Sequence, residues 1–121
     1  MAKKILIVDD NPADLKNLER IVTGQQMHTV SAMSGSEALE KARQEQPSMI
    51  LMDIIMDGMD GFNTCRELRK DAALSNIPVV FVSSKNQKAD HMWAEKQGAK
   101  ALISKPYEDQ DIISQLNSYA I

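Results

Sequence analysis

The sequence has little cysteine, few aromatic residues and no long apolar run, and each shortage excludes a class of protein. Cys65 is the single cysteine among 121 residues, so an internal disulfide cannot form and a cysteine-based zinc site lacks ligands. No apolar run approaches the roughly 20 residues that a membrane-spanning helix needs. The apolar stretch behind Lys3 and Lys4 is also too short for a secretory signal. A reducing cytoplasm is therefore the expected location, without membrane insertion.

An excess of charge of one sign is also missing. The chain carries 14 Lys and Arg against 17 Asp and Glu, which gives a formal net charge of −3. Mild acidity provides no broad positive surface for a phosphate backbone, so nucleic acid is excluded as a direct partner. A length of 121 residues with 43% hydrophobic residues fits one domain with a sufficient core. We expect residues 1–121 to form a single domain with no output domain attached.

Short apolar runs alternate with amphipathic stretches along the whole chain. The predicted strands are Ile5–Val8, a weaker one at Met27–Ala32, then Met49–Met52, Pro78–Val82 and Ala101–Ile103. The predicted helices run from Pro12 to Gly24, from a cap at Ser34 or Ser36 to Ala42, over Gly61–Lys70, over Gln87–Gln97, and onward from Pro106. This alternation predicts an α/β protein with a parallel sheet, right-handed crossovers and helices on both faces. On the helix at 87–97, Trp93 fits either half-buried packing or an interaction face, and we favour packing because one aromatic residue is not a patch.

Polar residues follow four of the predicted strands, where sheets of this kind bind their ligands. These residues are Asp9-Asp10, Asp53, Ser83-Ser84 and Lys105-Pro106. Carboxylates that converge at one sheet edge are costly without a cation, and Mg²⁺ prefers such oxygen ligands together with phosphate. Lys105 can pair with a carboxylate and later with a phosphoryl oxygen, to which the Ser83 hydroxyl can also donate. Together these groups meet the requirements of phosphoryl transfer to an aspartate.

These residues, in this order, resemble the receiver domain of bacterial two-component response regulators. The resemblance covers essentially the whole chain and rests on Asp9-Asp10, Asp53 within LMDIIMDGMDG, Ser83 after PVVFV, and Lys105-Pro106. The segment from Met92 to Tyr107 is more similar to stand-alone receivers associated with twitching motility and taxis. The resemblance implies a flavodoxin-like, doubly wound sheet of five parallel strands in the order 2-1-3-4-5 with five flanking helices.

The resemblance also implies a role for each site residue. Asp53 would accept a phosphoryl group from a histidine kinase or a phosphotransfer protein. Mg²⁺ would be held by Asp10, Asp53 and the backbone carbonyl of Ile55, with Asp9 acting through water. Ser83 and Lys105 would bind the phosphoryl oxygens. Such a protein catalyses only its own phosphorylation and dephosphorylation, is not otherwise an enzyme, and signals by altered binding to a downstream protein.

Several positions depart from the family pattern. Asp57 stands where receivers commonly have proline, and Leu102 stands where an aromatic switch residue is usual. A ring that swings between exposed and buried states therefore cannot operate at Leu102. Neither Ile55 nor Lys85 has a side chain suited to positioning an attacking water, so we expect slow to moderate loss of the phosphoryl group.

Other interpretations of the same residues stay open. Each polar residue, taken singly, also fits a solvated turn or a helix cap. A flavin or nucleotide binder would need a loop rich in Gly, Ser or Thr after the first strand, whereas Asp9–Pro12 is acidic and lacks glycine. An aspartate-based phosphatase would need a second acid where Ile55 stands. A degenerate receiver that acts as a phosphorylation-independent scaffold remains an alternative because of Leu102.

Overall fold

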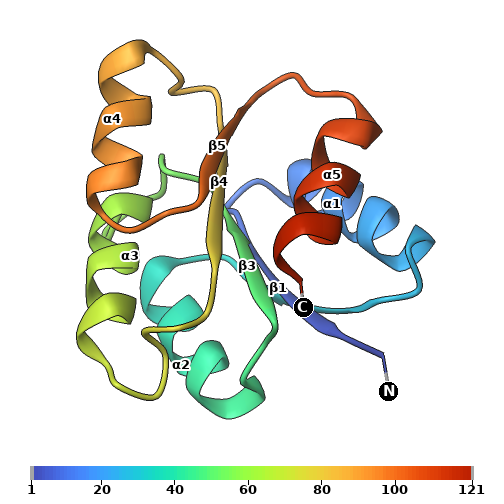
Figure 1. Cartoon of the computed structure of the whole chain (residues 1–121), viewed down its shortest axis with the longest axis horizontal. Helices are drawn as coiled ribbons and strands as arrows, with labels where there is room; N and C mark the ends of the chain where they lie inside the picture. Colours follow the sequence, from blue (N-terminus) through green and yellow to red (C-terminus); the bar gives the residue numbers. More distant parts are fainter. Residues whose placement is uncertain (1, 121) are drawn as a thin grey trace.

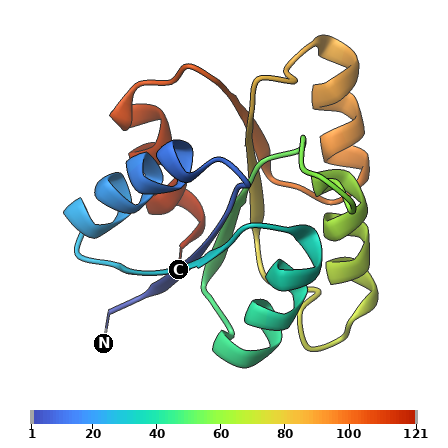
Figure 2. The same cartoon turned by 180° about the vertical axis from the view of Figure 1, so that it is seen from behind.

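The computed structural model describes residues 2–120, which form a central parallel sheet between two layers of helices (Figures 1 and 2). The elements are β1 (Lys4–Val8), α1 (Pro12–Gly24), β2 (His28–Ala32), α2 (Gly35–Glu45), β3 (Met49–Met52), α3 (Gly61–Lys70), β4 (Val79–Ser83), α4 (Lys88–Lys96), β5 (Ala101–Ser104) and α5 (Asp109–Tyr119). All pairings are parallel, and the strand order is β2-β1-β3-β4-β5. The predicted flavodoxin-like fold is therefore confirmed. No helix within residues 2–120 is long and apolar enough to cross a membrane.

The sheet is buried on both faces, which explains the uninterrupted apolar runs. Helices α1 and α5 cover one face, and α2, α3 and α4 cover the other (Figures 1 and 2). Along β1, Ile5 and Ile7 pack toward α1 and α5, whereas Leu6 and Val8 pack toward the opposite layer. Every residue of β3 and β4 is buried. The polar residues therefore follow strands that a well-packed core holds in place.

Most predicted boundaries lie within a few residues of the observed ones, and local chemistry accounts for the shifts. Ser34 caps α2, which continues past Ala42 to Glu45 because Gln46 adopts a left-handed conformation that ends it there. Helix α5 begins only at Asp109, because the Asp111 carboxylate accepts from the Glu108 N–H at 2.9 Å and caps the helix at that point.

The structure places Trp93 on α4 with its side chain about half-buried. Trp93 is 45% exposed, and the Lys96 ammonium lies 5.6 Å from the centre of its ring. Helix α4 buries only Ala94, so its apolar periodicity is too weak to turn Trp93 inward.

Helix α3 begins directly against the residue that follows β3. The Gly61 N–H donates to the Ile54 carbonyl at 2.8 Å. A Cβ atom on Gly61 would overlap the Asp53 carbonyl oxygen and lie 2.8 Å from the Ile54 Cα. Both obstacles are backbone atoms, which cannot move aside as the end of a flexible side chain can. Glycine at position 61 therefore allows the close approach that fixes the backbone of Asp53.

We predict that Gly61→Ala lowers the free energy of unfolding by about 1–3 kcal/mol, because the added methyl group meets fixed backbone. Gly24→Ala is the matched control, since a Cβ on Gly24 meets nothing within 4 Å. That variant should gain about 0.5 kcal/mol, because alanine restricts the unfolded chain. Urea unfolding of both variants measures the difference, and equal stabilities would contradict the close contact at Gly61.

Candidate functional site

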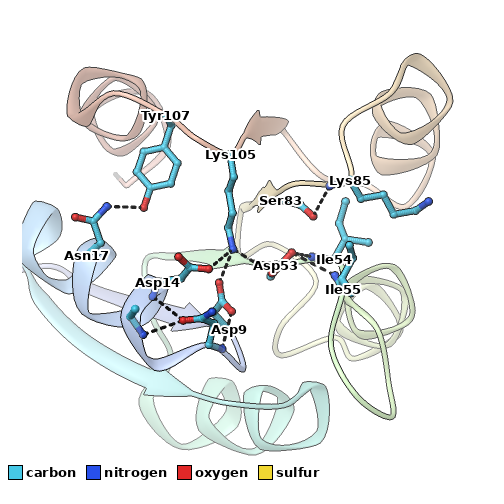
Figure 3. A network of polar contacts seen from close by, with 12 residues as sticks. Asp9, Asp14, Asn17, Asp53, Ile54, Ile55, Ser83, Lys85, Lys105 and Tyr107 are labelled. Atoms are coloured by element: carbon cyan, nitrogen blue, oxygen red, sulfur yellow. Dashed lines mark hydrogen bonds and ion pairs between the residues drawn. The ribbon is translucent and has the colours of Figure 1, made fainter.

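The carboxyl ends of four strands place the predicted site residues at one edge of the sheet. Asp9 follows β1, Asp53 follows β3, Ser83 ends β4, and Lys105 follows β5. Because the strands are parallel, these ends lie at the same edge, and Figure 3 shows the side chains gathered there.

The Lys105 ammonium lies among three carboxylates. Its Nζ donates to Asp9 Oδ2 at 2.9 Å, to Asp14 Oδ2 at 2.8 Å and to Asp53 Oδ2 at 3.1 Å (Figure 3). The Lys105 side chain is only 17% exposed, so these charge-assisted bonds are partly shielded from water. The structure thus joins three predicted residues, Asp9, Asp53 and Lys105, with one that was not predicted, Asp14.

Backbone N–H groups hold the second oxygen of the two buried carboxylates. Asp53 Oδ1 accepts from the N–H groups of Ile54 at 2.7 Å and Ile55 at 3.2 Å. Asp9 Oδ1 accepts from the Asn11 N–H at 2.9 Å. Both side chains are therefore held by backbone donors as well as by Lys105, with Oδ2 directed toward the ammonium.

The site is short of positive charge. Three carboxylates around one ammonium leave a net charge of −2 when all four groups are ionised. Burial raises the pKa of Asp9, although the bonds from Lys105 and Asn11 act in the opposite direction. Burial alone would lower the pKa of Lys105, but its bonds to Asp14 and Asp9 and the charge of Asp53 outweigh this and raise the pKa well above its usual range. The ammonium therefore stays charged, and the carboxylates would gain from a further cation.

Asp10 and Ser83 lie outside this ion-pair network. Asp10 is exposed, and its Oδ2 accepts from the Asp57 backbone N–H at 3.4 Å. Ser83 is fully buried, and its Oγ accepts from the Lys85 N–H at 3.1 Å. Within residues 2–120, neither side chain bonds to the side chain of Asp53 or Lys105. The predicted metal and phosphate residues are therefore not joined in one contact network. The remaining predicted residue, Ile55, was expected to act through its backbone carbonyl, and its side chain is 53% exposed beside Asp53.

The donor set nevertheless fits a hydrated Mg²⁺ ion. Asp9 and Asp10 follow β1 and Asp53 follows the adjacent strand β3, so carboxylate oxygens and excess negative charge occur side by side. The part of the chain that the structure describes holds no preformed cage of three His, Cys, Asp or Glu side chains. Mg²⁺ commonly needs no such cage, because it keeps several waters and uses one or two carboxylates together with phosphate oxygens.

Asp14 was not among the predicted site residues. It lies in the first turn of α1, where the Asn11 side chain accepts its N–H at 3.2 Å. Because helix α1 starts directly after the acidic pair, a residue of its first turn lies near the same edge of the sheet. This proximity could have indicated Asp14. The partner was not predictable, because Asp14 and Lys105 are 91 positions apart.

Two departures from the family pattern have clear structural settings. Leu102 is 8% exposed and packs in the core beneath α4, which leaves no aromatic ring to move there. Asp57 is exposed in the loop between β3 and α3. The aromatic side chain drawn beside the site is Tyr107, whose hydroxyl accepts from Asn17 Nδ2 at 3.0 Å (Figure 3). Tyr107 therefore packs toward α1, on a different side of β5 from α4.

Comparison with known proteins supports the resemblance inferred from these residues. Residues 5–117 match the response regulator receiver domain. The chain is 37% identical over 115 residues to Protein PilH of Pseudomonas aeruginosa, and the match covers 95% of each chain. Chemotaxis protein CheY4 of Vibrio cholerae has the same fold, with a TM-score of 0.92 at 21% identity over 98% of this chain and 99% of that one. The receiver domain of sensor histidine kinase PA1611 of P. aeruginosa, solved with a magnesium ion in its active site cleft, gives 0.91 at 21% identity over 99% and 98%.

We predict that Lys105→Met lowers the free energy of unfolding at neutral pH by about 3 kcal/mol, because it leaves buried carboxylates without a counter-charge. The native carboxyls of this variant then bind protons at higher pH than those of the unfolded chain. The loss should shrink as the pH falls toward about 4.

Urea unfolding at several pH values measures this loss. Lys70→Met is the control, because Lys70 forms an exposed pair with Glu67 and should cost less than about 1 kcal/mol. A Lys105→Met loss as small as that of the control, or one that does not depend on pH, would contradict the shared-ammonium geometry.

Proposed function

The chain belongs to the response regulator receiver domain family, and on that premise we propose that it accepts a phosphoryl group on Asp53 and signals through altered binding to a partner protein. The observation that carries the proposal is the contact between the Lys105 ammonium and the Asp53 carboxylate, 3.1 Å apart beside Asp9. Members of this family are not enzymes in the ordinary sense. We propose that this chain, too, catalyses only its own phosphorylation and dephosphorylation.

The chain's own residues hold the acceptor ready for transfer. The N–H groups of Ile54 and Ile55 fix one oxygen of Asp53, and Lys105 binds the other. In the transfer, an Asp53 oxygen forms a bond to phosphorus while the bond from phosphorus to the donor breaks and leaves its electron pair on the donor. Lys105 then offsets charge on the phosphoryl oxygens, which is the main catalytic need of this reaction.

We propose that Asp10, Asp53 and the Ile55 carbonyl hold Mg²⁺, with Asp9 acting through water. The bound ion would supply positive charge that balances both the carboxylates and the phosphoryl oxygens. The net charge of −2 around Lys105 and the all-oxygen donor set support this assignment. The exposure of Asp10 also leaves it accessible to an ion that keeps part of its hydration shell.

Ser83 connects the site to the loop that precedes α4. Its hydroxyl oxygen accepts from the Lys85 N–H, in the loop that leads into α4. To donate to a phosphoryl oxygen, Ser83 must reorient, and the loop must adapt to the change. We propose that this adjustment alters the surface of α4 and β5, without an aromatic swing at Leu102.

We propose a histidine kinase or a phosphotransfer protein as the phosphoryl source and a separate protein as the downstream target, in the cytoplasm. The 95% coverage of both this chain and PilH supports stand-alone action. We propose a pathway of chemotaxis or twitching motility from the resemblance of the Met92–Tyr107 segment to stand-alone receivers of that kind. The alternative is a degenerate receiver that acts as a scaffold without phosphorylation. The contact of Asp53 with Lys105 favours signalling by phosphorylation over the scaffold. A labelling experiment distinguishes the two functions.

We expect acetyl phosphate with Mg²⁺ to label wild-type protein on Asp53, and Asp53→Asn to abolish the label because the amide is not a nucleophile of this kind. Asp57→Asn is the matched control, since Asp57 is an exposed carboxylate of the same loop. Mass spectrometry of the modified peptide locates the label. Labelling of Asp53→Asn at the wild-type level would contradict the assignment of Asp53 as the acceptor. Absence of any label in wild type would favour the scaffold function.

We also expect the phosphorylated protein to lose its phosphoryl group over minutes rather than seconds. Ile55 is apolar and exposed beside Asp53, so it offers no group that orients an attacking water. Ile55→Asn should shorten the half-life, because an amide can bind and direct water. Time courses after removal of the donor measure both rates. A half-life of seconds in wild type, or no change in Ile55→Asn, would contradict this account.

A further inference from the structure

The shortest bond of the Lys105 ammonium goes to a residue with no role in the proposed function. Asp14 Oδ2 lies 2.8 Å from Lys105 Nζ, closer than the oxygens of Asp9 at 2.9 Å and Asp53 at 3.1 Å. Figure 3 shows the Asp14 carboxylate beside Lys105, on the side nearer to Asn17 and Tyr107. The position of Asp14 is fixed by the start of α1, where the Asn11 side chain caps the helix. Asp14 therefore draws the ammonium toward α1.

All donors of the Lys105 ammonium are already used. An ammonium group has three N–H donors, and here they bind Asp9, Asp14 and Asp53. A phosphoryl oxygen on Asp53 therefore needs a donor that an existing partner gives up or shares. Asp9 is 1% exposed, so release of its bond would leave a buried charge unpaired. The Asp14 side chain is 41% exposed, so water can solvate it instead.

The surroundings of Asp14 favour its release. A cavity of about 340 Å³ beside the site is lined by Asp14, Asn17, Lys105, Pro106 and Tyr107. This space is open to water and adjoins the carboxylate, so the lost bond to Lys105 can be replaced by hydration. Of the two carboxylates that stay charged after transfer to Asp53, Asp9 and Asp14, Asp14 is thus the one that loses less when the ammonium turns toward a phosphoryl group.

We infer that Asp14 is a positioning residue that holds Lys105 toward α1 in the unphosphorylated protein and competes with the phosphoryl group for it. This inference rests on the proposed function, because it needs Asp53 to be the acceptor. Removal of the Asp14 charge frees a donor of Lys105 and should speed phosphorylation. A role limited to the stability of α1, where a first-turn acid favours the helix dipole, predicts no acceleration.

The test measures initial labelling rates with acetyl phosphate and Mg²⁺ for wild type, Asp14→Asn and Asp57→Asn. Asp14→Asn removes the charge that contacts Lys105 while keeping the shape of the side chain. Asp57→Asn removes one charge from the same edge, next to Asp10, without touching a partner of Lys105. We expect Asp14→Asn to be labelled roughly two- to fivefold faster, the range that an exposed ion pair supplies, and Asp57→Asn to match wild type. Urea unfolding verifies that each variant is folded, and Asp14→Ser provides a second uncharged residue suited to a first turn.

Each outcome separates the inference from the proposed function. Wild type that is labelled on Asp53, with unchanged or slower labelling of both Asp14 variants, overturns the inference alone. Equal acceleration in Asp14→Asn and Asp57→Asn overturns it as well, because that result reflects general repulsion of an anionic donor. Wild type without any label on Asp53 removes the proposed function, and the inference falls with it.

Discussion

One ammonium group shared among three carboxylates is the interaction on which the rest of the site depends. Lys105 binds Asp9, Asp14 and Asp53 at once, so the charges of β1, α1, β3 and β5 are held together at one point. The balance is incomplete, because one positive charge faces three negative ones. A site in this condition tolerates and even favours additional positive charge. At the same time, it keeps the Lys105 ammonium close to Asp53, the proposed acceptor.

The fold supplies the rigidity that this arrangement needs. Strands buried on both faces end at the same edge, and backbone N–H groups then orient Asp9 and Asp53. Gly61 lets α3 begin in close contact with the backbone of Asp53 and Ile54. Asp14 and Ser83 differ from these fixed groups, since one is partly exposed and the other bonds to the loop before α4. The proposed acceptor is thus held in place, while the two residues proposed to change partners are partly exposed or bonded to a loop.

The sequence allowed the fold and most of the strand ends to be predicted, because apolar runs alternated with capped amphipathic stretches. It also placed Asp9, Asp53 and Lys105 correctly at one edge, since the ends of parallel strands converge. Asp14 was not predicted, because an ion pair between distant positions leaves no local pattern in the sequence. The orientation of Trp93 could be narrowed only to half-buried packing or an interaction face, since α4 buries too little apolar surface to give a periodic signal. The separation of Asp10 and Ser83 from Lys105 depends on side-chain geometry that strand ends alone do not specify.

The central claim, that this edge lacks positive charge and takes up Mg²⁺, is tested most directly by calorimetric titration of the unphosphorylated protein with the ion. One binding site is expected, weakened strongly in Asp10→Asn, because an exposed carboxylate ligand is lost without disturbing the buried pairs of Lys105. Nuclear magnetic resonance should place the responding backbone amides around Asp53 and Ile55. Absence of binding, or binding of equal strength in Asp10→Asn, would contradict the account.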